Sequence, residues 1–157
     1  MAISETSPRS PCVFSNVLDI VGDRWTLLVV RDLFFFGKHE YKEFLNSPEA
    51  IATNILAARL QKLSVAGIIE EIPHPENKSR KLYYLTERGK DLLPVLIEMA
   101  KWGEKHLPEV EMMRPLFEVI RRDASAFQRK VLRDLKVWEK KHLQTSNAHT
   151  DGSTSRC

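Results

Sequence analysis

The chain has 157 residues, of which 43% are hydrophobic and 29% are charged, values typical of a single soluble globular domain. The net charge of +3 is too small for a nucleic-acid role to rest on global charge, so such a role requires a local basic face. No apolar run approaches the ~20 residues of a membrane span, and the N-terminus lacks the apolar block of a secretory signal. We therefore expect a cytoplasmic protein with no membrane partner.

Metal-dependent and catalytic classes find no support in the sequence. Cys12 and Cys157 lie near opposite ends of the chain, which suits neither a disulfide framework nor a zinc site. The five histidines are scattered, without the spacing of a metal pair on one helix. No GxSxG, P-loop or GxGxxG motif is present, and no nucleophile–base arrangement is recognisable. We expect no metal, no cofactor and no enzymatic activity.

Residues 1–11 are polar and are expected to form a disordered tail. Apolar residues then recur at helical spacing over residues 13–21, which predicts a first helix. Asp23 can cap a second helix, from Arg24 to about Phe35, and Gly37 can end it. This second helix is apolar on most sides, so we expect it at the centre of the core.

A short helix around Tyr41 and a turn at Pro48 precede the stretch Thr53–Leu63. At about 100° per residue, its leucines fall on one side of a helix, and small or polar residues fall on the other. The leucine side comprises Leu56, Leu60 and Leu63, and the opposite side comprises Asn54, Ala58 and Gln61.

Two β-rich runs follow, at residues 68–72 and 81–85, separated by the turn-forming stretch "PHPENKSR". They predict a two-stranded hairpin whose tip carries Lys78 and Arg80. Thr86 can then cap a long helix, within which Pro94 should introduce a bend.

Residues 108–141 are expected to form a C-terminal basic amphipathic helix, and residues 142–157 a disordered tail. From Arg114 to Lys141 there are nine Lys or Arg residues against four Asp or Glu residues. The helix also has an apolar seam suited to a partner helix. The seam comprises Phe117, Ile120, Ala124, Phe127, Val131 and Trp138. Two roles remain open for this helix, singly or together: extending a dimer interface, or adding nonspecific attraction to DNA.

The predicted fold is mainly α with a small β-hairpin (α+β). Residues 12–107 follow the order of a winged helix-turn-helix DNA-binding domain, to which the C-terminal helix is an addition. A major groove ~12 Å wide admits one α-helix, whose outward side chains meet base edges. Amides such as Asn54 and Gln61 can pair with adenine, whereas cations contact phosphate and position the protein. The candidate DNA-binding residues are Thr53, Asn54, Ala57, Ala58, Gln61, Lys62, Lys78, Arg80 and Lys81. Arg59, beside the leucines, is expected to brace neighbouring helices instead.

The segment from Cys12 to about His106 resembles the HxlR-type winged helix-turn-helix transcriptional regulators. Four blocks agree in order and spacing: "LDIVGDRWTLLVVRDLFFFG", "NILAARLQKLSVAGIIE", "YYLTERGKDLLPVL" and "WGEKH". The resemblance implies a sequence-specific regulator, either repressor or activator, that binds an inverted-repeat operator in double-stranded DNA. It also implies a homodimer formed mainly by the first and last helices of the domain.

The chain departs from the family pattern in three places. Val13 follows the N-terminal cysteine where many members have proline, and Ala52 precedes the recognition helix where many have serine. The helix after Pro115 lies beyond the usual end of the family, so its role is not implied by the resemblance.

The resemblance also makes Cys12 a candidate redox sensor, because some relatives sense oxidants or electrophiles through a cysteine at this place. A position near a helix N-terminus favours the reactive thiolate. An inert thiol packed at the dimer interface is the alternative. For the whole chain, the alternative function is a winged-helix module that binds another protein through the same face, without direct DNA contact.

Overall fold

The computed structural model describes residues 9–108 and 111–147. The chain divides into two compact units, residues 1–89 and residues 90–157. This boundary falls before residue 107, where the winged domain was expected to end, so the last helix of the family segment packs in the second unit.

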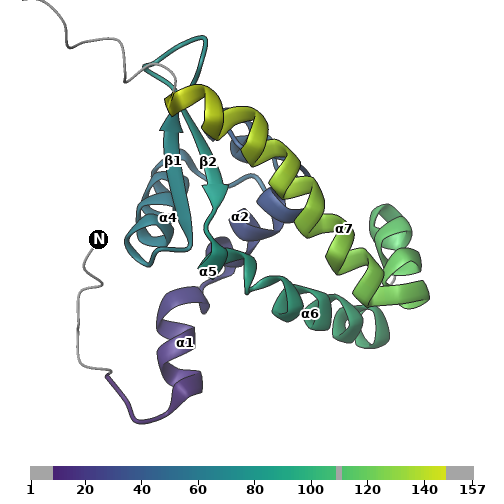
Figure 1. The fold of residues 1–157 in the computed structure, drawn as a ribbon. Helices are drawn as coiled ribbons and strands as arrows, with labels where there is room; N and C mark the ends of the chain where they lie inside the picture. Colours follow the sequence, from purple (N-terminus) through teal and green to yellow (C-terminus); the bar gives the residue numbers. More distant parts are fainter. Residues whose placement is uncertain (1–8, 109–110, 148–157) are drawn as a thin grey trace, which may run out of the picture. The chain divides into compact units, whose positions relative to one another are not determined.

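Four helices begin the first unit, as predicted. They are α1 (Val13–Val21), α2 (Arg24–Phe35), α3 (Tyr41–Leu45) and α4 (Thr53–Val65) (Figure 1). Asp23 caps α2 by accepting hydrogen bonds from the backbone amides of Trp25 and Thr26. After α2, Gly37 adopts φ +59°, a left-handed conformation that glycine reaches without a Cβ clash.

The core of the first unit centres on α2, which packs against α4. Val30 and Leu33 of α2 are at most 1% exposed, and Leu56 and Leu63 of α4 are fully buried. Asp32 is also buried, and its Oδ2 accepts hydrogen bonds from Lys38 Nζ at 3.0 Å and Ser47 Oγ at 2.5 Å. Because Ser47 lies in the turn between α3 and α4, this buried carboxylate fixes the approach to α4.

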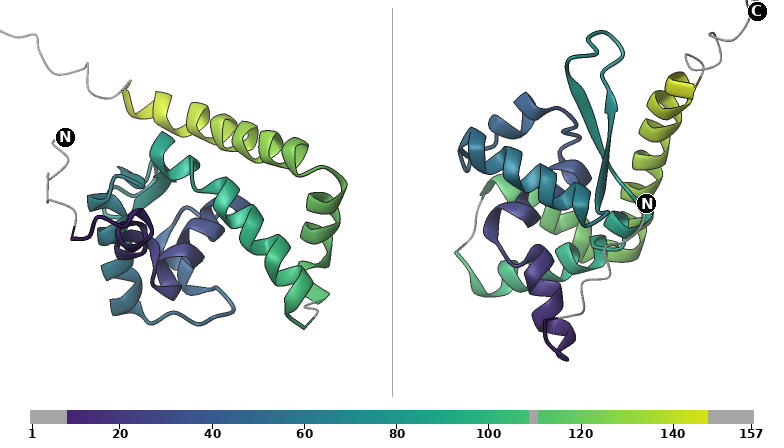
Figure 2. Two further views of the ribbon diagram at one scale, coloured as in Figure 1. Left: turned by 90° about the horizontal axis from the view of Figure 1, so that it is seen from below. Right: turned by 90° about the vertical axis from the view of Figure 1, so that its left-hand side faces the viewer.

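The predicted hairpin consists of β1 (Ile69–Pro73) and β2 (Lys81–Leu85), which pair antiparallel with Ile69 opposite Leu85 and Glu71 opposite Tyr83. Its two strands extend as a narrow ribbon (Figure 2). Ile69, Leu82 and Leu85 turn inward and are at most 5% exposed. The element order and the hairpin confirm the predicted winged helix-turn-helix fold.

The chain after Thr86 differs from the single bent helix that was predicted there. A short helix, α5 (Glu87–Lys90), precedes α6 (Leu93–His106), and Pro94 lies in the first turn of α6. A proline lacks an amide hydrogen, and the first turn of a helix is where that hydrogen has no intrahelical acceptor, so the chain restarts a helix here. Thr86 does act as a cap, since its Oγ1 accepts a hydrogen bond from the amide of Gly89 at 3.0 Å.

A 3₁₀ turn, η1 (Glu111–Met113), leads into the long helix α7 (Arg114–Asn147), which packs against α6. Asp123 has non-helical angles (φ −162°, ψ 94°) and its Oδ1 accepts from the amide of Ala126, so it caps the second part of α7. Two residues of the seam predicted for a partner helix are buried, with Ile120 at 3% and Val131 at 6% exposure, and the other four are half-buried. Burial of these two residues contributes to the fold of one subunit, and the role of the seam in a dimer interface stays a prediction.

The two predicted tails are shorter than expected. α7 continues to Asn147, so residues 142–147 are helical rather than disordered. At the other end, Arg9 pairs with Asp19 of α1, with Nε and Oδ2 2.9 Å apart. The rest of both tails, residues 1–8 and 148–157, lies outside the described residues. Within the described ranges, no helix has the length and apolar character needed to cross a membrane.

Candidate nucleic-acid interface

One side of α4 is exposed, as the helical periodicity predicted. Leu56, Leu60 and Leu63 are at most 3% exposed, so they fix the rotation of the helix about its axis. The predicted base-contacting residues all lie on the exposed side: Thr53, Asn54, Ala57, Ala58 and Gln61. The arrangement presents two amides and two small side chains to a ligand outside the unit.

Two contacts hold α4 in place at its polar edges. Tyr41 of α3 donates a hydrogen bond from Oη to the carbonyl of Thr53 at 2.6 Å, which joins the two helices at the first turn of α4. Asp23 lies near both Arg59 and Lys62, with Oδ1 3.1 Å from Arg59 Nε and Oδ2 3.3 Å from Lys62 Nζ.

Burial tends to raise the pKa of the Asp23 carboxyl, but hydrogen bonds from Thr26 and Lys62 and the charge of Arg59 hold that pKa below its ordinary value. Asp23 thus caps α2 and anchors α4 with one carboxylate. The bracing role predicted for Arg59 agrees with this contact, although its Nε is not aligned for a hydrogen bond. Lys62, which was predicted to contact phosphate, is half-buried. Its ammonium group already pairs with the Asp23 carboxylate.

Carboxylates on the same unit also neutralise two of the three predicted cations of the hairpin. Arg80 pairs with Glu40, the residue preceding α3, and Lys81 Nζ lies 2.5 Å from Glu71 Oε1 across the hairpin. Lys78 is exposed and forms no ion pair with any residue that the structure describes. Lys78 is therefore the hairpin cation that is available to phosphate without breaking an existing pair.

A groove of about 320 Å³ separates α4 from the hairpin. Gln61 and Ala57 line it from the α4 side, whereas Lys81, Glu71 and Tyr83 line it from the hairpin. Sequence analysis missed Glu71 and Tyr83 as part of this surface. The alternation of a strand places Lys81 and Tyr83 on one face, and the register sets Glu71 opposite Tyr83, so the pairing of the strands was the missing information.

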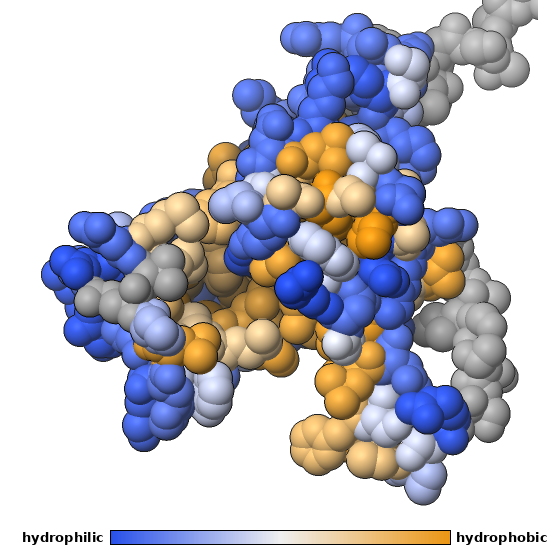
Figure 3. All heavy atoms as spheres, turned by 180° about the vertical axis from the view of Figure 1, so that it is seen from behind, coloured by the Kyte–Doolittle hydropathy of each residue, from blue (hydrophilic) through white to orange (hydrophobic). Residues whose placement is uncertain are grey.

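Helix α1 exposes an unusually apolar face for a chain of this composition. Val13, Phe14, Val17 and Leu18 are 44–76% exposed, and Val21 is the buried residue of this helix. In Figure 3, α1 is the projection at the lower right, and orange spheres, which mark hydrophobic residues, gather on it. Cys12, at the N-cap of α1, is exposed and carries a free thiol.

Helix α6 has an apolar row of its own, at Val95, Met99 and Trp102, which are spaced by four and three residues and are 46–61% exposed. Exposed apolar rows of this kind indicate sites of contact with another protein surface. The described residues contain no group of three or more His, Cys, Asp or Glu that could hold a metal ion.

Comparison with known proteins gives one consistent result. The model of a family described as HxlR-like helix-turn-helix matches residues 20–111. An uncharacterized HTH-type transcriptional regulator of Mycobacterium tuberculosis is 33% identical over 112 residues, covering 71% of this chain and 70% of the relative. A similarly described regulator of Synechocystis is 36% identical over 98 residues, covering 62% of this chain and 72% of the relative.

Solved structures show the same fold. PA1607, proposed to be a transcription factor, is similar with a TM-score of 0.59 and 37% identity, covering 66% of this chain and 70% of its own. The oxidized form of the redox regulator HypR has a TM-score of 0.55 at 27% identity and covers 63% of this chain and all of its own. The reduced form of the regulator YodB from Bacillus subtilis has a TM-score of 0.51 at 27% identity. This match covers 62% of this chain and 96% of YodB.

Proposed function

We propose a specific DNA-binding role for this chain, which belongs to the HxlR-like helix-turn-helix family of transcriptional regulators. Membership confirms the predicted family and the prediction that the chain is a regulator, not an enzyme. The proposal is that α4 enters a major groove, where Asn54 and Gln61 discriminate between bases and Lys78 contacts phosphate. The observation that carries it is the exposed amide-bearing side of α4, opposite three buried leucines.

The small side chains on α4 support a close approach to DNA. Ala57 and Ala58 are exposed and add no long side chain between the helix backbone and a ligand. At the first turn, Ala52 is the N-cap and no side chain caps the helix, so its terminal amides remain free to donate to a phosphate oxygen. Lys62 and Lys81 are secondary phosphate contacts. Each already pairs with a carboxylate of its own unit, and a phosphate must compete with that carboxylate.

The test separates base recognition from phosphate contact. Fragments bound by the full chain are selected from mixed genomic DNA, and affinities are then measured over a salt series. Gln61→Ala should relax sequence choice at one position by about 1–3 kcal/mol. Lys78→Gln should weaken all duplexes about equally and reduce the slope of log affinity against log salt by about 0.9 per protomer.

A wild-type chain that binds no duplex, or variants that leave sequence choice untouched, would reject the proposal in favour of a winged-helix module that docks on protein. Asn46→Ala, which removes an exposed amide at the end of α3 and outside the groove between α4 and the hairpin, is a matched control for Gln61→Ala. It should leave the preferred sequence unchanged.

The proposed regulator acts as a homodimer on an inverted repeat. The exposed apolar rows of α1 and α6 support this assembly, because they are the helices that the family resemblance implicates in dimerisation. Two-fold symmetry would place the half-sites one helical turn, about 34–36 Å, or a multiple of it, apart.

We also propose that Cys12 makes the regulator responsive to oxidants or electrophiles. Its thiol is exposed beside the apolar face of α1, and the similar structure HypR is described as a redox regulator. Oxidant should then change the affinity for the selected DNA in the wild type, and Cys12→Ser should abolish that change. A response that persists in the variant would rule out Cys12 as the sensor.

A further inference from the structure

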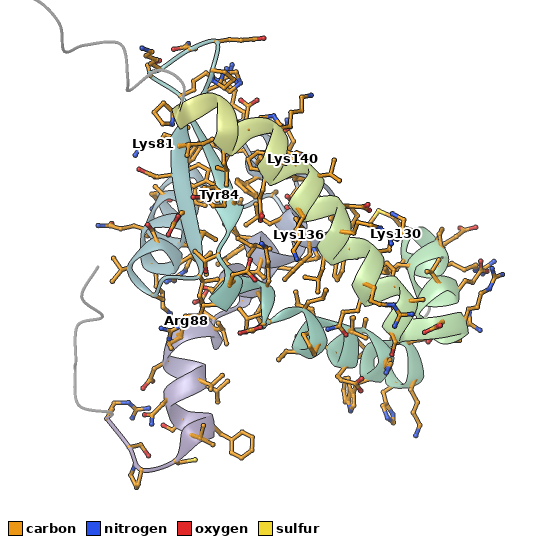
Figure 4. The ribbon with its side chains drawn as sticks, in the orientation of Figure 1. Lys81, Tyr84, Arg88, Lys130, Lys136 and Lys140 are labelled. Atoms are coloured by element: carbon orange, nitrogen blue, oxygen red, sulfur yellow. The ribbon has the colours of Figure 1, made fainter. Side chains whose placement is uncertain are left out.

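The second part of α7 carries four cations that the proposed recognition site does not use. Arg129, Arg133, Lys136 and Lys140 are separated by four, three and four residues. At about 100° per residue they lie within about 60° of one another around the helix axis. We call these four residues the α7 basic row, and Figure 4 labels Lys136 and Lys140 on this helix.

The rotation of α7 about its axis is fixed by the opposite side of the helix. Val131 is 6% and Leu135 is 8% exposed, and Phe127 and Trp138 are half-buried on the same side. Glu139, at the edge of this side, pairs with the buried Lys90, with Oε1 and Nζ 2.7 Å apart. The helix cannot roll without uncovering these apolar residues, so the α7 basic row is held on the exposed side.

The four cations are also unneutralised, unlike Arg121 and Lys130 of the same helix. Arg121 pairs with Glu104 at 2.9 Å, and Lys130 pairs with Asp134 at 2.6 Å. Each residue of the α7 basic row is exposed, and none forms an ion pair with a residue that the structure describes. Like charges spaced by three or four residues on a helix repel one another. Binding of an anion would reduce this repulsion within the α7 basic row.

We propose that the α7 basic row is a second DNA-contacting surface, which binds the phosphate backbone without discriminating between bases. The row spans eleven residue steps, or about 16 Å of helix at 1.5 Å per residue. Duplex DNA carries one negative charge per ~1.7 Å of its axis, so it can engage several of the four cations at once. Guanidinium and ammonium groups suit phosphate oxygens and carry no base specificity in such contacts.

This surface is an addition to the shared domain, because the family match ends at residue 111 and the row begins at Arg129. The inference rests on the proposed DNA-binding function. In that function, α4 selects the DNA sequence, and the α7 basic row adds affinity and salt dependence.

The experiment compares two double variants that remove the same charge from the same helix. Arg133→Gln with Lys136→Gln disrupts the basic row, and Arg121→Gln with Lys130→Gln removes exposed cations that are already paired. Binding of each full-length variant to a selected genomic duplex and to a shuffled duplex is measured by fluorescence anisotropy over a salt series. Circular dichroism establishes that both variants keep the helix content of the wild type.

The basic-row variant should lower the slope of log affinity against log salt by about 1.8 per protomer, or about 0.9 per lost contact. Its fold loss should be equal on the two duplexes, and the control variant should change the slope much less. Equal slopes for the two variants, or wild-type affinity in the basic-row variant, would overturn the inference while leaving α4 as the reader of sequence. That result would point to an acidic protein partner for this helix. A wild type that binds neither duplex would overturn the proposed function as well.

Discussion

Glu71 and Lys81 show how individual residues set the strength of the candidate interface. Lys81 Nζ donates to Glu71 Oε1 at 2.5 Å, and this hydrogen bond raises the pKa of Lys81. A phosphate must compete with this carboxylate for the ammonium group and is also repelled by it. Glu71→Gln should therefore increase affinity for DNA several-fold, with a steeper dependence on salt, in an anisotropy titration.

Glu70→Gln provides the matched control for this prediction. Glu70 precedes Glu71 on β1, so its side chain lies on the other face of the hairpin, where its Oε2 accepts from Tyr84 Oη at 2.5 Å. The same change in charge there should have a smaller effect on DNA affinity. If both variants bind equally more tightly, overall charge rather than the Glu71–Lys81 pair controls affinity.

Ala50 is the described non-glycine residue with a positive φ, at 53°, in the turn before α4. A Cβ in the left-handed region costs roughly 1–2 kcal/mol, whereas glycine adopts that region readily. Glycine also has more conformational freedom in the unfolded chain, and this entropy offsets part of the gain. Ala50→Gly should therefore raise the free energy of unfolding by about 0.5–1 kcal/mol. Thermal unfolding followed by circular dichroism would detect a higher Tm.

Ala66→Gly tests whether that gain belongs to the turn. Ala66 ends α4 with right-handed angles (φ −73°, ψ −4°), where glycine offers no relief from strain. This substitution should leave Tm unchanged or lower it. A rise of Tm in both variants would mean that strain at Ala50 is not the cause.

At the scale of elements, the carboxylate of Asp23 joins the beginning of α2 to the polar edge of α4. Its pKa in the folded chain is lowered, so its contribution to stability is present above the ordinary aspartate pKa of about 3.9 and is lost as pH falls toward the lowered value. The wild type should therefore lose stability as the pH falls from about 5 to 3, and Asp23→Asn should lose less over the same range.

Urea unfolding at pH 7 and at pH 3.5 measures this linkage. The difference in unfolding free energy between the two pH values should be smaller in Asp23→Asn than in the wild type. Some acid dependence will remain, because Arg31 also lowers the pKa of Glu49 through a hydrogen bond. An unchanged difference would show that Asp23 does not couple α2 to α4 through its charge.

The exposed apolar rows belong to the scale of the whole molecule, because one chain leaves them uncovered. Phe14 is 76% and Leu18 is 62% exposed on α1. Burial of a large apolar side chain contributes about 1.5–3 kcal/mol, and a homodimer loses two copies, so Phe14→Asp should weaken the proposed dimer by roughly 100-fold or more. Sedimentation equilibrium of the full chain measures the dimer constant.

Val137→Asp is the control for this prediction. Val137 is 65% exposed on α7, away from the buried seam of that helix. It should leave the dimer constant near that of the wild type. If Val137→Asp disrupts the dimer and Phe14→Asp does not, α7 rather than α1 forms the interface.

Much of the fold could be predicted from the sequence because the decisive signals are local. Helical spacing separates the leucines of α4 from Asn54 and Gln61, and this rotation needs no knowledge of distant residues. Asp23 and Thr86 cap the helices that follow them, as their position in the sequence indicates. The winged order of the elements and the exposed side of α4 followed from these signals.

The charge state of the candidate site was decided only by the tertiary structure. Arg80 meets Glu40, which is forty residues away, and Lys62 meets Asp23, which is thirty-nine residues away. Local sequence marks such residues as cations but contains no information about which carboxylate the fold brings near. For the same reason it could not show that Ile120 and Val131 of the α7 seam are buried. Periodicity depends on neighbours in the chain, whereas ion pairing and burial depend on neighbours in space.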